Sequence, residues 1–345
     1  MIELLIDGVK GVFMPTLADS ITLYTEKWSM GELKFKVLKD GSIDFKEGNA
    51  VMLKVNGKNM FYGYVFTKKR TKEGIISVTC YDQLRYLKNK DTYTYSNKKA
   101  SEVIKMICDD YNLKTGVITD TNFILPERIE DNTTLFDIIY TAINLTTLHT
   151  KKSYVLYDDF GKITLNKTEN LRTNLLINKE TAIDFNYKTT IDTGVYNKVK
   201  LLHKKDTKYT HIRNEYQASD PTKIKEWGIL QYYQHIDENT DGNATAKAIL
   251  DFNKTKNRKL VINTFGNLYV RAGSSVYINL DIGDFVVNEE MEIYSCLHTF
   301  SENDHTMEID VRGGILNEWY WKYDKGACKG YYWTEQACCH CNRQG

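Results

Sequence analysis

Residues 48–55, GNAVMLKV, and residues 273–280, GSSVYINL, are the stretches that decide the fold. Each begins with a glycine and continues as a run in which apolar and polar residues alternate, which is typical of a strand with one buried face. The glycine and the first valine match at one offset, because Gly273 minus Gly48 and Val276 minus Val51 both equal 225. We therefore expect one β-module to occur twice in this chain.

The segments that follow these two stretches extend the similarity. FYGYVF (61–66), a polar hairpin KKRTKEG (68–74) and IISVTCYD (75–82) follow the first stretch, and MEIYSCLHTF (291–300), SENDH (301–305) and TMEIDVRG (306–313) follow the second. Strand–hairpin–strand units also recur by chance in β-rich chains. Read as a duplication, the pattern indicates a protein that presents doubled symmetry to a partner, which is a mechanical role rather than a catalytic one.

The composition narrows the class of protein. A chain of 345 residues is long enough for two to three domains, and its 46 Lys plus Arg balance 45 Asp plus Glu, which argues against nucleic-acid or anionic-membrane partners. The 24 Tyr favour strands, and only 3 Pro argue against disordered linkers. The longest apolar runs are too short for a membrane span, and the start, MIELLIDG, predicts no secretory signal.

The pattern predicts a mainly β fold with an α/β insert, in four parts. Residues 1–87 carry short alternating strands such as LKFKV (33–37), which are typical of a small barrel. Residues 88–190 form an α/β middle domain, and residues 191–314 form a second barrel with a polar insertion near 203–240. Residues 315–345 are a Cys- and Trp-rich tail.

Two helices and a hairpin are expected in the middle domain. Apolar residues at helical spacing mark the first helix, and the second begins after Asn132 or Thr133 as its N-cap. The hairpin YVLYDDFGKITL turns at 158–161. The residues expected on the buried helix faces are Ala100, Val103, Ile104, Ile107, Cys108 and Tyr111, then Leu135, Ile138, Ile139 and Ala142.

Several segments together resemble the XkdQ family of defective-prophage tail proteins, which are relatives of the late control gene D hub proteins of contractile phage tails. The resemblance covers about residues 1–312 and excludes the tail. It is carried by FYGYVFTKKR (61–70), the run from IISVTCYDQLRYLK to ICDDYNL (75–113), TLFDIIYTAINL (134–145), YVLYDDFGKITL (154–165), the strand at 198–202, AKAILDFN (246–253) and VINTFGNLYVRAGSSVYI (261–278).

This resemblance implies two tandem tail-tube-like barrels per chain and a homotrimer on the tail axis. Three chains then show six barrels to a six-fold tail tube and three-fold symmetry to the spike below. The other partners implied are baseplate subunits around the ring and a tape measure protein inside it. Such a hub is assembled in the bacterial cytoplasm, becomes part of the phage tail or bacteriocin particle, and is released by lysis.

The sequence contains little that indicates catalysis. Asp158 and Asp159 are adjacent at the predicted hairpin turn, where Asp is favoured for local hydrogen bonds, and Glu289 and Glu290 are expected in a turn between strands. His298 alternates with apolar neighbours, which favours a core or interface histidine. We therefore predict a non-enzymatic protein; the alternative is a hub with peptidoglycan-hydrolase or glycan-binding activity, the latter through Trp319, Trp321 and Trp333.

Basic side chains gather in the first hairpin, at Lys68, Lys69, Arg70 and Lys72. A solvated turn explains them, and the sharper hypothesis is contact with an acidic neighbouring subunit of the baseplate. DNA binding is the weakest hypothesis because no aromatic residues are interleaved.

Cysteines fall into two groups. Cys80, Cys108 and Cys296 lie at apolar positions and are expected to be buried. The other four crowd the last eighteen residues with a histidine, and metal binding, disulfides and free thiols all stay open. If zinc or an iron–sulfur cluster binds, the expected ligands are Cys328, Cys338, Cys341 and His340, with Cys339 as the substitute.

Overall fold

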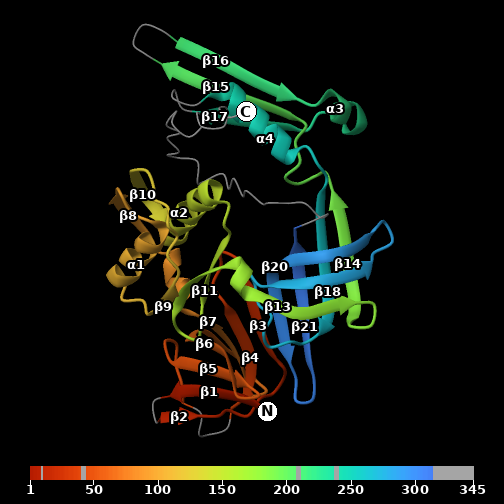
Figure 1. Ribbon diagram of the computed structural model, residues 1–345. Helices are drawn as coiled ribbons and strands as arrows, with labels where there is room; N and C mark the ends of the chain where they lie inside the picture. Colours follow the sequence, from red (N-terminus) through yellow and green to blue (C-terminus); the bar gives the residue numbers. More distant parts are fainter. Residues whose placement is uncertain (9–10, 40–43, 207–210, 237–240, 314–345) are drawn as a thin grey trace. The chain divides into compact units, whose positions relative to one another are not determined.

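Figure 1 shows the computed structural model of the chain, which describes residues 1–345 apart from 9–10, 40–43, 207–210, 237–240 and 314–345. The described chain divides into two compact units. The main body contains Met1–Tyr187 and the described residues from Leu260 onward, and the insert contains Lys188–Lys259. The insert therefore interrupts the main body between two of its strands.

The described part of the main body is mainly β, with two α-helices and two short 3-10 helices, as the sequence predicts for its fold class. Its first strands are β1 (Ile2–Gly8), β2 (Gly11–Phe13), β3 (Ile21–Glu26), β4 (Glu32–Leu38), β5 (Ala50–Val55), β6 (Lys58–Arg70) and β7 (Ile75–Tyr81). Its last strands are β13 (Arg172–Asn178), β14 (Ala182–Thr190), β18 (Asn257–Phe265), β19 (Ser275–Asp281), β20 (Val286–Phe300) and β21 (His305–Arg312).

These 13 strands form one hydrogen-bonded sheet in the order β14-β18-β21-β20-β3-β4-β7-β6-β5-β1-β2, with β13 and β19 paired beside β20. Alternation along the chain explains which faces are buried. In β4, Leu33, Phe35 and Val37 are buried while Lys34 and Lys36 are exposed, as the LKFKV pattern predicts. Two apolar cores result, one in the first half of the sheet and one in the second.

The segment between β7 and β13 builds a separate α/β core inside the main body. It contains η1 (Gln83–Lys88), β8 (Lys90–Tyr95), α1 (Ala100–Asp110), β9 (Thr115–Ile118), β10 (Arg128–Thr134), α2 (Leu135–Thr150), β11 (Tyr154–Asp158), β12 (Ile163–Lys167) and η2 (Thr168–Leu171). The predicted helix faces are buried in this core, except that Tyr111 is only partly buried. The N-cap of α2 is Thr134, whose hydroxyl accepts from the Asp137 N–H, rather than Asn132 or Thr133.

The described insert is a small α/β unit. Its elements are β15 (Lys198–Asp206), β16 (His211–Ser219), α3 (Pro221–Trp227), β17 (Gln231–Ile236) and α4 (Gly242–Asn253). The strands pair in the order β16-β15-β17, and α4 contributes Ala246, Ile249 and Leu250 to a core with Val199 and Leu201. Part of the stretch expected to be a polar insertion therefore forms strands, and most described residues of β16 and all of β17 alternate between partly buried and exposed.

One turn expected from the sequence is absent. Glu289 and Glu290 lie inside β20, where Glu290 is opposite Tyr277. The chain turns earlier, where the Ile282 N–H donates to the Phe285 carbonyl. Glu290 is accommodated in the strand because its carboxylate accepts from the Ser275 hydroxyl at 2.5 Å and pairs with Arg172. In the described residues, no helix has the length and apolar character needed to cross a membrane.

Candidate functional site: the junction of two β-modules

Two β-modules repeat in the main sheet. The first β-module is β3, β4, β7 and β6 with β5, and the second is β14, β18, β21 and β20 with β19. Gly48 and Gly273 both have positive φ, +88° and +84°. Gly48 N–H donates to the Val65 carbonyl at 2.8 Å, and Gly273 N–H donates to the Ile293 carbonyl at 2.8 Å. The duplication predicted from sequence is thus present at the level of individual hydrogen bonds.

The same strand irregularity follows in each module. Val65 N–H donates back to Asn49, and Ile293 N–H donates back to Ser274. The next residue, Phe66 in one module and Tyr294 in the other, is then an extra residue in the pairing with the following strand. A bulge bends its strand and increases the local twist. Because both bulges fall one residue after the matched bond, the modules share their curvature as well as their strand order.

The modules join through antiparallel pairing of β20 with β3. Six residue pairs form this junction, from Ser295 opposite Glu26 to Phe300 opposite Ile21. Phe300 and Ile21 are fully buried. At the other end, Lys27 Nζ contacts Glu292 Oε1 at 2.6 Å, and both side chains are mostly buried. The junction is therefore continuous sheet with an apolar end and a charged end.

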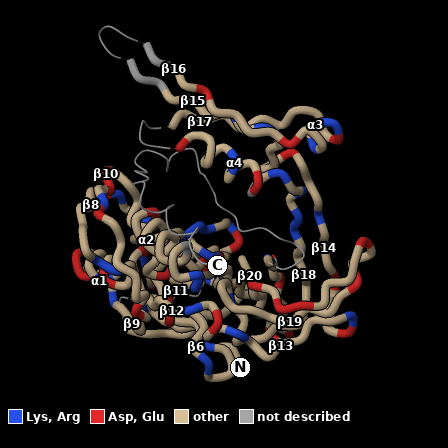
Figure 2. Tube along the Cα trace, turned by 45° about the horizontal axis from the view of Figure 1, so that its top comes forward, with Lys and Arg blue, Asp and Glu red and all other residues tan. Residues whose placement is uncertain are grey.

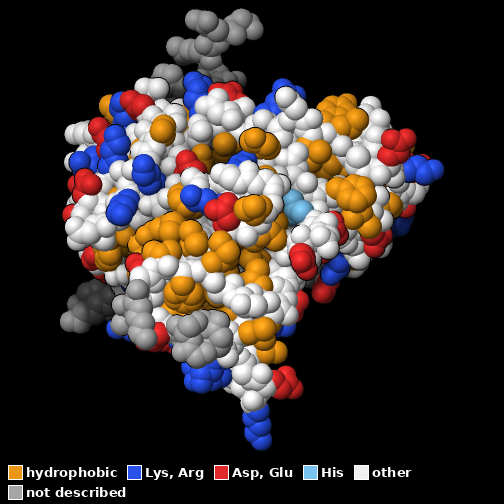
Figure 3. Space-filling model, turned by 90° about the horizontal axis from the view of Figure 1, so that it is seen from below, with side chains coloured by type: hydrophobic (Ala, Val, Ile, Leu, Met, Phe, Trp, Pro, Cys, Tyr) orange, Lys and Arg blue, Asp and Glu red, His pale blue; other side chains and the backbone are white. Residues whose placement is uncertain are grey.

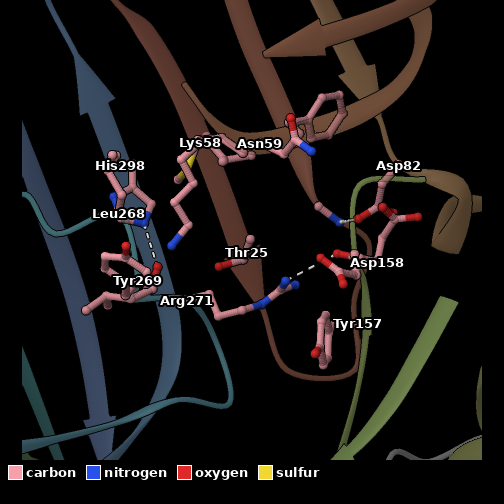
Figure 4. A pocket seen from close by; sticks show the side chains of 16 residues that line it. Thr25, Lys58, Asn59, Asp82, Tyr157, Asp158, Leu268, Tyr269, Arg271 and His298 are labelled. Carbon is pink, nitrogen blue, oxygen red and sulfur yellow. Dashed lines mark hydrogen bonds between the residues drawn. The ribbon is translucent and has the colours of Figure 1, made fainter. Parts of the chain in front are cut away.

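A cavity of about 190 Å³ lies beside the junction. Figure 4 shows that its charged and polar side chains come from the first β-module, from the α/β core and from the second β-module. Lys58 and Asp82 belong to the first β-module and the turn after it, Asp158 ends β11, and Arg271 precedes β19. Segments far apart in sequence thus place a small cluster of opposite charges between them.

Arg271 is the cation of this cluster. Its guanidinium lies 4.0 Å from the centre of the Tyr157 ring, and Nη1 donates to the main-chain carbonyl of Asp158 at 3.2 Å. Burial lowers the pKa of Arg271, and the nearby carboxylates oppose that effect. The buried guanidinium is held by a ring face and a carbonyl.

Two carboxylates face this cation. Burial, and then the neighbouring charge of Asp158, raises the pKa of Asp82 well above its usual value. Burial raises the pKa of Asp158 to about 6, although its bond from the Gly161 N–H at 2.6 Å opposes that shift. Asp82 is held by the main-chain N–H of Gly31 at 2.7 Å and of Leu84 at 3.0 Å.

These contacts favour a structural cluster over a catalytic pair. Both oxygens of Asp82 accept from the backbone, so this carboxylate is fixed to its own turn. Asp158 makes the local bond to Gly161 that the hairpin pattern predicts, but its Oδ2 is buried with no hydrogen-bond partner in the described chain. The turn was predictable, whereas the burial of Asp158 beside Arg271 was not, because 113 residues separate the two.

His298 is a core histidine, as its alternation predicts. It is 1% exposed, and its Nε2 contacts the Val270 carbonyl at 2.9 Å while Nδ1 contacts His305 Nε2 at 3.0 Å. Burial lowers the pKa of His298 to about 4. Cys296 lies 3.3 Å from Nε2 and is buried, as are Cys80 and Cys108, so the prediction for these three cysteines is confirmed.

The predicted metal ligands Cys328, Cys338, Cys341 and His340, and the substitute Cys339, lie outside the described residues. Within the described ranges, no group of three His, Cys, Asp or Glu side chains is arranged to hold a metal ion. The metal site therefore stays a prediction about the tail.

The surface shows mixed charge and gathered apolar side chains. Figure 2 shows Lys and Arg interspersed with Asp and Glu along the trace, in keeping with the balanced composition. Figure 3 shows hydrophobic side chains gathered into a broad patch on the face seen from below Figure 1. Exposed apolar side chains near the amino terminus include Met1, Val12 and Met14. Such patches are common where proteins bind each other.

The chain is similar to a family of known proteins. The family model described as YQBQ-like matches residues 21–312. Protein YqbQ of Bacillus subtilis is 33% identical over 277 residues, which cover 77% of this chain and 81% of that protein. Protein XkdQ of the phage-like element PBSX of Bacillus subtilis is 31% identical with the same coverage.

Solved structures share the fold at low identity. The 43 kDa tail protein of prophage MuSo2 from Shewanella oneidensis has a TM-score of 0.65 at 14% identity, over 90% of this chain and 98% of that one. A tail protein from Neisseria meningitidis has a TM-score of 0.62 at 10% identity, over 91% and 97%. The chain thus shares the fold of these two tail proteins.

Proposed function

Because this chain belongs to the YqbQ-like family, we propose that it is the central structural hub of a contractile-tail baseplate, in a phage or an R-type bacteriocin. The observation that carries the proposal is the repeated strand order, β14-β18-β21-β20 followed by β3-β4-β7-β6. A chain with two equivalent modules lets three copies offer six modules to a six-fold tube. The same three copies keep three-fold symmetry toward a spike.

In this proposal each β-module, with its flanking strands, acts as one tail-tube-like barrel. Residues 1–87 would form the first barrel, 88–190 the middle domain and 191–314 the second barrel with its polar insertion, and the last two strands of the middle segment, β13 and β14, would complete the second barrel. The tail tube binds above, the spike below, other baseplate subunits bind around the ring, and a tape measure protein lies inside. The protein is assembled in the bacterial cytoplasm and leaves by lysis as part of the particle.

The proposed role is mechanical and involves no catalysis. Buried charges that are tied to backbone groups fix geometry more than they add stability. Asp82, Asp158 and Arg271 come from three separate parts of the main body, so their contacts suit a rigid body that transmits force. The alternative is a hub that also hydrolyses peptidoglycan or binds glycans. A purified chain that clears labelled peptidoglycan would support that alternative.

Native mass spectrometry of the purified chain tests the hub. The protein is produced in cells grown with zinc and iron available, and it is measured alone and together with its tube and spike proteins. We expect a species at three times the 40.0 kDa chain. Added mass per chain that disappears when the four tail cysteines are changed to serine would identify a metal in the tail. A chain that stays monomeric with both partners present contradicts the hub.

A further inference from the structure

A second cavity, of about 480 Å³, lies beside the loop that precedes β19. Tyr269 and Arg271 line both this cavity and the smaller one at the junction, so the loop that carries them borders both. The rest of the wall is the segment that runs from the end of η2 into β13. Three asparagines, two residues with hydroxyl groups and an exposed tyrosine give the second cavity a polar lining with one aromatic ring.

An irregularity in β13 makes room for this cavity. Between the pairing with Ser275 and the pairing with Tyr277, β13 contains three residues where β19 contains one. A bulge of this kind bends its strand and turns side chains away from the regular ladder. The Thr173 hydroxyl bridges the gap by donating to the Ser275 carbonyl at 2.7 Å. Residues 173–175 therefore border a hollow instead of continuing a regular strand.

Local contacts hold both walls in place. On the β13 side, Arg172 pairs with Glu290, whose carboxylate also accepts from the Ser275 hydroxyl at 2.5 Å. On the loop side, the Ser274 hydroxyl accepts from the Arg271 N–H at 3.1 Å and donates to the Arg271 carbonyl at 2.6 Å. A site whose walls are fixed before the ligand arrives loses less conformational freedom on binding.

The side-chain amides of the cavity keep both kinds of hydrogen-bonding group for a ligand. Asn170 Nδ2 donates to Asn166 at 2.9 Å, which leaves the Asn170 carbonyl oxygen as an acceptor. Asn267 Oδ1 accepts from the Tyr269 N–H at 2.9 Å, which leaves the Asn267 amide nitrogen as a donor. Asn174 adds one more amide at the bulge. A ligand that donates and accepts at the same time, as a hydroxyl group does, suits this set.

Tyr269 supplies an aromatic face. Its side chain is 74% exposed, although the bond from its N–H to Asn267 fixes its turn. Lys58 Nζ lies 3.2 Å from the centre of the ring and so occupies one face of it. The high exposed fraction means that the other face is open to a ligand.

The charged residues in this lining already have partners. Arg172 is paired with Glu290. Figure 4 shows the Arg271 side chain turned toward Tyr157 and Asp158. Among the described residues that line the second cavity, none is an aspartate or a glutamate. The lining therefore favours an uncharged ligand. A peptide is held mostly by strand edges, whereas the amides here stand beside an aromatic ring, which is the arrangement that suits a sugar.

We propose that the second cavity binds an uncharged sugar unit of a glycan. The Tyr269 ring stacks against the C–H face of the sugar, and the amides of Asn170, Asn174 and Asn267 bond to its hydroxyl groups. The proposal goes beyond the hub, because it needs neither the trimer nor the tryptophans of the tail. It gives the main body a binding site that the mechanical role does not use.

Saturation-transfer NMR with the full chain tests this proposal. The neutral probes are chitotetraose, cellotetraose and maltotetraose; tetragalacturonate is the charged probe and tetraalanine the peptide probe, each at millimolar concentration. We expect transfer to the ring C–H protons of at least one neutral tetrasaccharide. A stronger signal from tetragalacturonate than from every neutral sugar would contradict an uncharged ligand.

Variants locate the binding. Tyr269→Ala should weaken it about tenfold because stacking is lost, whereas Tyr269→Phe keeps the ring and should bind like the wild type. Asn174→Ala should weaken it about threefold, because one hydrogen bond is lost. The matched control is Tyr277→Ala, which removes a tyrosine of β19 that is 42% exposed and lies outside the cavity lining. This control should bind like the wild type, and circular dichroism should be unchanged in all four variants.

Three results overturn the proposal. They are no transfer to any of the three neutral sugars, binding of equal strength in Tyr269→Ala, and transfer to tetraalanine alone, which would make the cavity a peptide site. A chain with Trp319, Trp321 and Trp333 changed to alanine should still bind, and a loss there would place the sugar on the tail instead. Native mass spectra of Tyr269→Ala should match those of the wild type, so a failure of the sugar site leaves the hub standing.

Discussion

Arg271 is the residue on which the two buried carboxylates depend. Arg271→Met keeps an apolar stem against Tyr157 but leaves Asp82 and Asp158 without their cation. Losing the donor to the buried Asp158 carbonyl costs about 1–3 kcal/mol, and losing the positive charge near the two carboxylates adds to it. We expect that loss in the free energy of unfolding at pH 8 and a smaller loss at pH 5. Asp158, with a pKa of about 6, and Asp82, whose pKa is also raised, take up protons as the pH falls.

Guanidinium chloride unfolding at the two pH values measures this difference. Lys58→Met is the matched control, because its ammonium group lies over the Tyr269 ring in the same cavity and has no hydrogen bond to either carboxylate among the described contacts. A loss of the same size at pH 5 and pH 8 in Arg271→Met would show that the charge of Arg271 does not matter.

His298 makes a second prediction about pH. The unfolded chain binds a proton at this histidine below its ordinary pKa of 6.5, whereas the folded chain does so only below about 4. The contribution of His298 to stability is therefore complete above pH 6.5 and falls by about 3 kcal/mol as the pH drops to 4. The difference in unfolding free energy between wild type and His298→Gln should shrink by that amount between pH 7 and pH 4.

Urea unfolding at both pH values gives this difference, with His235→Gln in the insert as the control variant. An NMR titration of the His298 ring checks the cause directly. A ring that titrates near pH 6.5 in the folded protein is incompatible with the prediction.

At the scale of elements, the matched glycines give a paired experiment. Gly48 and Gly273 both have positive φ, where a side chain costs about 1–2 kcal/mol. A Cβ at Gly48 meets no atom within 4 Å, whereas one at Gly273 would lie 2.4 Å from Val155 Cγ2. Gly273→Ala should therefore lower the thermal unfolding midpoint more than Gly48→Ala. Adding Val155→Ala should recover part of the difference, and equal midpoints for the two glycine variants would refute this account.

Local sequence patterns predict most of these elements. The remaining features depend on contacts between residues that lie far apart in the sequence. Leu33, Phe35 and Val37 alternate, and α1 and α2 carry apolar stripes, so their burial follows from neighbours in sequence. Glu290 resembles a turn residue in the sequence because its partners, Arg172 and Ser275, lie in other strands. Sequence patterns likewise do not predict the cluster around Arg271. Its two carboxylates, Asp82 and Asp158, lie in turns far from Arg271 in the sequence, and each also makes an ordinary local hydrogen bond that explains its presence there.

At the scale of the whole molecule, the insert occupies a position that the first β-module fills with a short turn. β3 and β4 are joined by Lys27–Gly31, whereas their counterparts β14 and β18 are joined by the chain that forms the insert. The ends of the insert are close, since Asn257 Nδ2 donates to the Thr193 carbonyl at 3.4 Å. Replacing residues 191–256 with Lys-Trp-Ser-Met-Gly should leave the main body folded.

Near-ultraviolet circular dichroism and a cooperative urea transition measure that outcome. Trp28 reports on the main body, because its ring packs 4.9 Å from that of Tyr140. A shortened chain that unfolds without cooperativity would mean that the main body depends on the insert.

The pairing of β20 with β3 also decides how the two modules respond to load. Six residue pairs lie side by side along these strands. A pull along the strand axis shears all six together, so they must break at once. A pull across the strands peels them one after another from an end. The chain should therefore resist being stretched along β20 far better than being opened across it, and a single molecule held by handles in the two modules would yield at different forces in the two directions.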